Sequence, residues 1–293
     1  MPLNPLKPPA ARVDVQTDHW RHLLTIALDH VDSRSYISKA QVASAIREAC
    51  INVGFFYVKN HGIDEAAISS TLDISRRFFD LPLEGKMKID FSKTPNFRGY
   101  YPMAQRRFLP ESYEMGPDIE ASPDIPMNGR NVWPSEDAIP GFKEIMLKYY
   151  LHLVYYPPQS LKVGGQDCGV GAHTNFQFFT ILWQDDHRAL QVQNASGQWI
   201  DADPIPGTFV INLADQLARW TNEIFKSTVH RAIHISETQR YSIPLFFGID
   251  YNVNLEVLPS CVSESRPARY EPILAGECLK ARMEKAYGYA IGK

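Results

Sequence analysis

Three short stretches decide the fold of this chain: Gly171-Ala172-His173-Thr174-Asn175, His230-Arg231, and Arg240-Tyr241-Ser242. His173 and Asn175 are two residues apart, as are Arg240 and Ser242, so each pair points to the same face of an extended strand. Strand-like runs separated by turn-like residues lie between the two histidines. This pattern is typical of a β-barrel or jelly roll, which brings residues distant in the chain into one pocket.

The residue types in these stretches are those of a metal site beside a carboxylate site. Two imidazoles and one oxygen-donating side chain form the facial triad that holds Fe(II) and leaves coordination positions open. His173, His230 and Asn175 supply such a set. An arginine beside a hydroxyl binds a carboxylate, because the guanidinium presents a rigid fork of donors. Arg240 and Ser242 supply that pair, and an internal salt bridge of Arg240 is the alternative.

On these residues the chain resembles the 2-oxoglutarate/Fe(II)-dependent dioxygenase superfamily of the isopenicillin N synthase-like type. That family has His-x-Asp, a second His nearly sixty residues later, and Arg-x-Ser about ten residues further on, the spacing seen here. Two shorter segments also match the family: Phe55–Ile63 (FFYVKNHGI) and Tyr155-Tyr156-Pro157-Pro158. The resemblance spans roughly residues 25–250, which is nearly the whole chain.

The resemblance implies both cofactors and an activity. Fe(II) would be held by His173, Asn175 and His230, and 2-oxoglutarate by Arg240 and Ser242. Tyr156 would hydrogen-bond this cosubstrate, although a plain core aromatic is a nearly equal alternative. The implied activity is oxidation of a small organic metabolite by O2 (hydroxylation, desaturation or ring modification), in secondary metabolism. His61, His187 and His234 match no ligand position, and we expect a turn contact for His61 and surface positions for the other two.

One residue departs from the family pattern, because Asn175 stands where the family has Asp. A carboxamide is a neutral and weaker oxygen ligand, so affinity for Fe(II) is expected to fall. Three interpretations remain open. The chain is an enzyme that tolerates Asn because 2-oxoglutarate chelates the metal, or an inactive relative that only binds small molecules, or an Asp-to-Asn variant.

The predicted fold class is mainly β with flanking helices: a double-stranded β-helix (jelly-roll) core with an N-terminal α/β cap. We expect a flexible lead-in at residues 1–20, the cap region at 21–140, and the core with a C-terminal helix at 141–293. A predicted helix ending near Tyr150 runs into a strand at Leu151 with no turn residue between them. The family has a long helix there, so its loss predicts bare apolar surface.

Composition places the chain among ordinary globular proteins. The hydrophobic fraction is 44%, the charged fraction 22% and the net charge -3, which argues against nucleic-acid or membrane partners. The four cysteines are scattered, a pattern that favours reduced thiols and a cytoplasmic location. We expect a small-molecule substrate and O2 as partners, and a monomer or weak homo-oligomer.

Overall fold

The computed structural model describes residues 23–28, 36–103, 110–121, 128–149, 152–158, 169–234 and 236–287. The predicted lead-in at 1–20 lies outside these ranges, and so does the junction at residues 150 and 151.

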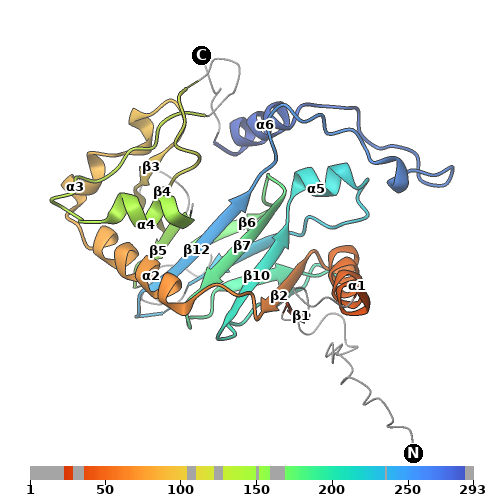
Figure 1. Cartoon of the computed structure of the whole chain (residues 1–293), viewed down its shortest axis with the longest axis horizontal. Coiled ribbons are helices and arrows are strands. Elements are labelled where there is room, and N and C mark those ends of the chain that lie inside the picture. Colours follow the sequence, from red (N-terminus) through yellow and green to blue (C-terminus); the bar gives the residue numbers. More distant parts are fainter. Residues whose placement is uncertain are drawn as a thin grey trace, which may run out of the picture.

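Helices and strands alternate in the first half of the described chain, and strands dominate the second half (Figure 1). The helices are α1 (Tyr36–Asn52), α2 (Glu65–Phe79), α3 (Leu83–Met87), η1 (Phe91–Lys93), α4 (Phe142–Tyr149), α5 (Asp215–Trp220), η3 (Pro259–Cys261) and α6 (Ala275–Tyr287). The strands are β1 (Thr25–Ala27), β2 (Phe55–Lys59), β3 (Gly99–Tyr101), β4 (Glu111–Glu114), β5 (Leu153–Tyr156), β6 (Gly169–His173), β7 (Phe179–Gln184), β8 (Leu190–Gln193), β9 (Trp199–Asp201), β10 (Thr208–Leu213), β11 (His230–Ile233) and β12 (Arg240–Phe247).

The strands form two sheets, which is the jelly-roll architecture predicted from the sequence. The major sheet has eight strands in the order β1-β2-β10-β7-β12-β5-β4-β3, and the minor sheet has four in the order β6-β11-β8-β9. Strands from the N-terminal region therefore extend the major sheet at both ends. Side chains of β2 and β10 pack against those of β8 in the space between the sheets, as Phe55, Val192 and Val210 illustrate.

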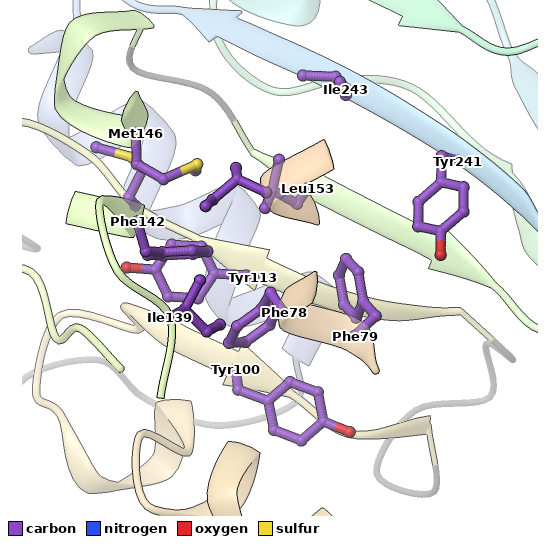
Figure 2. Packing of buried hydrophobic residues seen from close by; sticks show 12 residues of the cluster. Phe78, Phe79, Tyr100, Tyr113, Ile139, Phe142, Met146, Leu153, Tyr241 and Ile243 are labelled. Carbon is purple, nitrogen blue, oxygen red and sulfur yellow. The ribbon is translucent and has the colours of Figure 1, made fainter. Parts of the chain in front are cut away.

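Helices α2 and α4 cover one end of the outer face of the major sheet. Their buried side chains join those of β3, β4, β5 and β12 in a cluster rich in aromatic rings (Figure 2). Phe78 is fully buried at its centre and meets the rings of Phe79 and Tyr113 at centroid distances of 5.1 and 5.2 Å. Helix α2 begins after Asp64, whose side chain accepts a hydrogen bond from the backbone N–H of Ala66 (2.9 Å) and so caps the helix.

Helix α1 covers the other end of the same face, and the sheet centre between the two helical layers is less protected. Val42, Ala45 and Ala49 of α1 pack on β2 and β10. Between the layers, Phe247 of β12 stacks on Phe179 of β7 (centroids 4.6 Å apart) and remains 46% exposed. The bare apolar surface expected from the shortened segment before Leu151 stays a prediction, because residues 150 and 151 lie outside the described ranges.

No helix within the described ranges has both the length and the apolar character needed to span a bilayer.

Two phenylalanines on the outer face should respond very differently to truncation. Phe78→Ala empties a fully buried site and should lower the free energy of unfolding by about 3–5 kcal/mol. Phe247→Ala removes a half-exposed ring and should lower it by about 1 kcal/mol or less. Denaturant unfolding of both variants measures the contrast. Equal losses would mean that the sheet centre is covered in solution, for instance by a second copy of the chain.

Candidate active site

Antiparallel pairing of β6 with β11 brings the two predicted histidines together. His173 and His230 are direct partners in this ladder, and their ring centroids lie 4.3 Å apart. At the start of β6, Gly169 has φ +144, and a Cβ there would lie 1.9 Å from the carbonyl oxygen of Ala232. Only glycine permits this close approach of the strands, so Gly169 contributes to the position of His173.

The two rings use the same nitrogen, Nδ1, for a backbone carbonyl. Nδ1 of His173 lies 2.8 Å from the carbonyl oxygen of Gly171, and Nδ1 of His230 lies 3.1 Å from that of Thr228. A ring that donates from Nδ1 to a carbonyl keeps the lone pair of Nε2 for another partner, as metal-binding histidines do.

Burial keeps both imidazoles neutral near pH 7, which is the form that binds a metal. It lowers the pKa of His230 to about 3, with help from the neighbouring His173. Burial also lowers the pKa of His173, opposed by hydrogen bonds to the Gly171 carbonyl and the Asn175 side chain.

Asn175 completes the group of predicted metal ligands. Its Nδ2 donates to Oγ1 of Thr180 on β7 (2.7 Å), and its side chain lies close enough to the ring of His173 to raise the pKa of that imidazole. The structure therefore brings His173, His230 and Asn175 into one cluster. Two neutral imidazoles and an amide oxygen fit Fe(II), although the amide is a weaker ligand than the family's carboxylate.

Arg240 lies fully buried on the inner face of β12 and retains an unused donor. Its Nε donates to the carbonyl oxygen of His187 (3.2 Å) and its Nη2 to Oε1 of Gln184 (3.3 Å), while its Cζ lies 4.5 Å from the centroid of the Tyr156 ring. Among the described residues, Nη1 has no hydrogen-bond partner and no carboxylate forms an ion pair with Arg240. The internal salt bridge is therefore not observed in the described part of the chain.

Ser242 lies on the same face of β12 as Arg240 and is also buried (3% exposed). A buried guanidinium with a free N–H, beside a buried hydroxyl, fits an anionic ligand such as the carboxylate of 2-oxoglutarate.

Residues between the histidines and Arg240 connect the two halves of the site. Tyr156 packs against Ala232 of β11, and its ring centroid lies 6.0 Å from that of His234. The expectation that His234 lies at the surface is wrong, because it is 1% exposed. Its Nε2 contacts the carbonyl oxygen of Thr238 at 2.7 Å. His61 makes the expected turn contact, since its Nδ1 accepts from the backbone N–H of Ile63 (3.2 Å).

Sequence reasoning missed a contact between the C-terminal helix and the ligand segment. Arg282 of α6 donates from Nη2 to Oγ1 of Thr174 (2.9 Å), forms an ion pair with Asp215, and stacks over Phe176 (5.0 Å). No spacing or motif links position 282 with position 174. Thr180 beside Asn175 was also missed, although Thr180 alternates with Phe178 and Leu182 in the sequence and so shares their face of the strand.

Another group with metal-ligand side chains lies in the turn after β7: Asp185, Asp186 and His187. Asp185 already accepts hydrogen bonds from the backbone N–H groups of His187 (3.0 Å) and Tyr241 (2.6 Å). Stabilisation of the turn accounts for this group without a metal.

Two families of known proteins match this chain. The family described as non-haem dioxygenase in morphine synthesis N-terminal matches residues 25–136, and the 2OG-Fe(II) oxygenase superfamily matches residues 144–249.

Individual relatives agree with these families. The 2-oxoglutarate-Fe(II) type oxidoreductase ppzC of Metarhizium majus is 31% identical over 88% of this chain and 86% of that protein. A 2-oxoglutarate-Fe(II) type oxidoreductase of Aspergillus fumigatus is 32% identical over 86% and 90%. The crystal structure of a full-length Neurospora crassa protein in complex with alpha-KG and thymine has a TM-score of 0.83 and 28% identity, covering 94% of this chain and 100% of that chain.

The alignment with ppzC extends over 320 positions, more than the 293 residues of this chain, so the relative contains residues with no counterpart here. The matched families, relatives and fold agree with the arrangement of the site. The chain belongs to the 2-oxoglutarate/Fe(II)-dependent oxygenase superfamily, whose members use Fe(II), 2-oxoglutarate and O2 to oxidise small molecules.

Proposed function

We propose that this chain oxidises a small organic metabolite at an Fe(II) ion held by His173, His230 and Asn175, with 2-oxoglutarate bound by Arg240 and Ser242. The observation that carries the proposal is the histidine pair on β6 and β11, with Nδ1 of both rings engaged by backbone carbonyls. When bound, Fe(II) and 2-oxoglutarate supply oxidation by O2 coupled to loss of carbon dioxide from the cosubstrate.

The protein's own residues bind and orient the reactants. Arg240 and Ser242 attract the far carboxylate of 2-oxoglutarate, and burial strengthens this attraction because it removes competing water. The ring of Tyr156 lies against the guanidinium, which supports a role in holding Arg240 in place. A hydrogen bond from Tyr156 to the cosubstrate stays a prediction.

The substrate is proposed only as a class. One curated relative is a homoarginine-6-hydroxylase from Oryza sativa and another an azadirone synthase from Melia azedarach, while the Neurospora crassa structure contains thymine. These names describe chemically unlike small molecules, which supports a metabolite of secondary metabolism without selecting one. They also give no support to the interpretation as an inactive relative, since each of the two curated names denotes an enzyme.

Removing either histidine should abolish metal binding. His173→Ala and His230→Ala each leave the metal with one imidazole, so iron content after reconstitution should fall to background. His61→Ala is the matched control, because His61 contacts only a turn amide and a neighbouring ring and should leave iron content unchanged. Metal analysis measures the result, and normal iron content in both site variants would disprove the assignment.

Arg240→Lys should weaken binding of 2-oxoglutarate strongly, because an ammonium group cannot replace the fork of a guanidinium. Breaking one side of a buried charge pair costs about 2–5 kcal/mol, so affinity should fall at least thirtyfold. Arg188→Lys is the control, since Arg188 forms an exposed ion pair with Asp203. Titration calorimetry with the metal-loaded protein measures both, and equal affinities would exclude the proposed clamp.

Asn175 should make binding of metal and cosubstrate interdependent. The three protein ligands carry no charge, so the doubly negative 2-oxoglutarate supplies all the negative charge around Fe(II). We expect weak iron binding alone and tighter binding with 2-oxoglutarate present, with a coupling of about 1–3 kcal/mol. Asn175→Asp should raise iron affinity and reduce this coupling.

Iron titrations of both forms, with and without 2-oxoglutarate, measure the coupling, and succinate release with candidate substrates measures turnover. If the Asp form binds iron no better than the Asn form, residue 175 does not contact the metal. If iron affinity rises but succinate never forms, the binding-only interpretation is favoured.

A further inference from the structure

Asp215, the first residue of α5, contacts both chain segments that carry the candidate metal ligands. Its Oδ2 accepts a hydrogen bond from Oγ1 of Thr174 (3.2 Å), and its Oδ1 accepts one from Oγ of Ser227 (2.7 Å). Thr174 lies between His173 and Asn175 in the chain. One carboxylate is therefore shared by the segment that carries two candidate ligands and the segment that leads to the third.

The contact with Ser227 bears on the orientation of His230. Ser227 is followed by Thr228, whose backbone carbonyl oxygen lies 3.1 Å from Nδ1 of His230. The side chain of Thr228 is itself anchored, because its Oγ1 donates to the carbonyl oxygen of Val53. Holding Ser227 in place therefore restrains, from the other side, the carbonyl that faces the His230 ring.

A bridge is needed at this point because the two histidines form the last pair of their ladder. His173 ends β6, His230 begins β11, and the register of the ladder shifts between His230 and Ala232. Beyond the histidine pair, the ladder supplies no hydrogen bonds between the two segments. The carboxylate of Asp215 joins them there, one residue beyond His173 and three residues before His230.

The direction of these hydrogen bonds follows from the charge of the carboxylate. Arg282 of α6 forms an ion pair with Oδ2 of Asp215, which favours the ionised form. An ionised carboxylate only accepts hydrogen bonds, so Thr174 and Ser227 are the donors. Nη2 of Arg282 also donates to Oγ1 of Thr174 (2.9 Å), which leaves the single hydroxyl proton of Thr174 for Asp215.

Backbone contacts of the same region do not depend on the side chain at position 215. The N–H of Asp215 donates to the carbonyl oxygen of Asn175 (2.9 Å), and the N–H of Gln216 donates to that of Gln177 (3.1 Å). A substitution of Asp215 can keep both hydrogen bonds, so it tests the carboxylate separately from the main chain.

We propose that Asp215 is a positioning residue whose carboxylate holds Thr174 and Ser227 together and so keeps the candidate metal ligands at the separation that a shared metal requires. The inference rests on the proposed function, because it assumes that His173, Asn175 and His230 are metal ligands. It makes metal affinity depend on a residue that does not itself contact the metal.

The test measures Co(II) affinity by calorimetry and by the visible absorption of bound Co(II), which accepts nitrogen and oxygen ligands without reacting with O2 as Fe(II) does. Asp215→Ala removes both acceptor oxygens, so affinity should fall about 10- to 100-fold, as for other groups that orient metal ligands. Its absorption spectrum should also change, because the ligands are held less uniformly. Asp215→Asn keeps the shape and one acceptor oxygen and should lose less affinity.

A second variant removes the two donors and leaves the ion pair with Arg282 in place. Thr174→Val combined with Ser227→Ala should lower Co(II) affinity as Asp215→Ala does. Adding Asp215→Ala to this pair should cause little further loss, because all three changes break the same two contacts. The double variant decides the question if Asp215→Ala does not fold.

Gln216→Leu is the matched control for the packing of α5. The side chain of Gln216 is 2% exposed, and its Nε2 donates to the carbonyl oxygen of Ala275 on α6 (2.8 Å). Losing this contact should lower the melting temperature, but Co(II) affinity of the folded protein should stay normal. Thermal melting of every variant separates a loss of metal affinity from a loss of stability.

Two results would overturn the inference: normal Co(II) affinity in Asp215→Ala or in the double variant, or an equal loss of affinity in Gln216→Leu. The second would mean that the packing of α5, and not the carboxylate, controls the metal site. His173→Ala is the reference for the proposed function. If that variant binds Co(II) normally, the metal site itself is wrong; if it does not, normal binding by the Asp215 variants counts against this inference alone.

Discussion

The backbone ladder between β6 and β11 is the constraint on which the site depends. It places His173 directly opposite His230, so their separation follows from strand spacing and not from flexible side chains. A register slip of one residue would turn one histidine to the other face of the sheet. The missing Cβ of Gly169 permits the strands to approach, and backbone carbonyls then orient each ring. Main-chain geometry thus sets most of the candidate metal centre before any ligand binds.

Much of this arrangement could be predicted because strand alternation is a local property. The strands that carry His173 and His230 and the shared face of Arg240 and Ser242 on β12 all followed from short spacings. His234 is instructive, since its alternation with His230 already placed it on the inner face. The polar character of His234 suggested a surface position, but the strand alternation, which predicts burial, was correct. The contacts of Gln184 with Arg240 and of Arg282 with Thr174 depend on how distant segments pack, which no single-chain spacing encodes.

Charge distribution explains why the site suits an anionic cosubstrate. Arg240 is buried with no ion-pair partner among the described residues, and the three candidate metal ligands are neutral. A buried cation without a counter-charge destabilises the folded protein, and a bound dicarboxylate would offset that cost. The substitution at position 175 therefore leaves a pocket of more positive charge than the family's carboxylate would give.

The contact between Arg282 and Thr174 also bears on how the protein is made. The two residues are 108 positions apart, and α6 is the last described element of the chain. Synthesis runs from the N-terminus at about 5–20 residues per second. Strands β6 and β11, which carry the histidines, therefore leave the ribosome before Arg282 of α6 has been made. A nascent chain can pair β6 with β11 first, but Thr174 gains its contact with Arg282 only after α6 has been synthesised. A chain released before α6 is made would form a jelly roll in which Thr174 lacks its contact with Arg282.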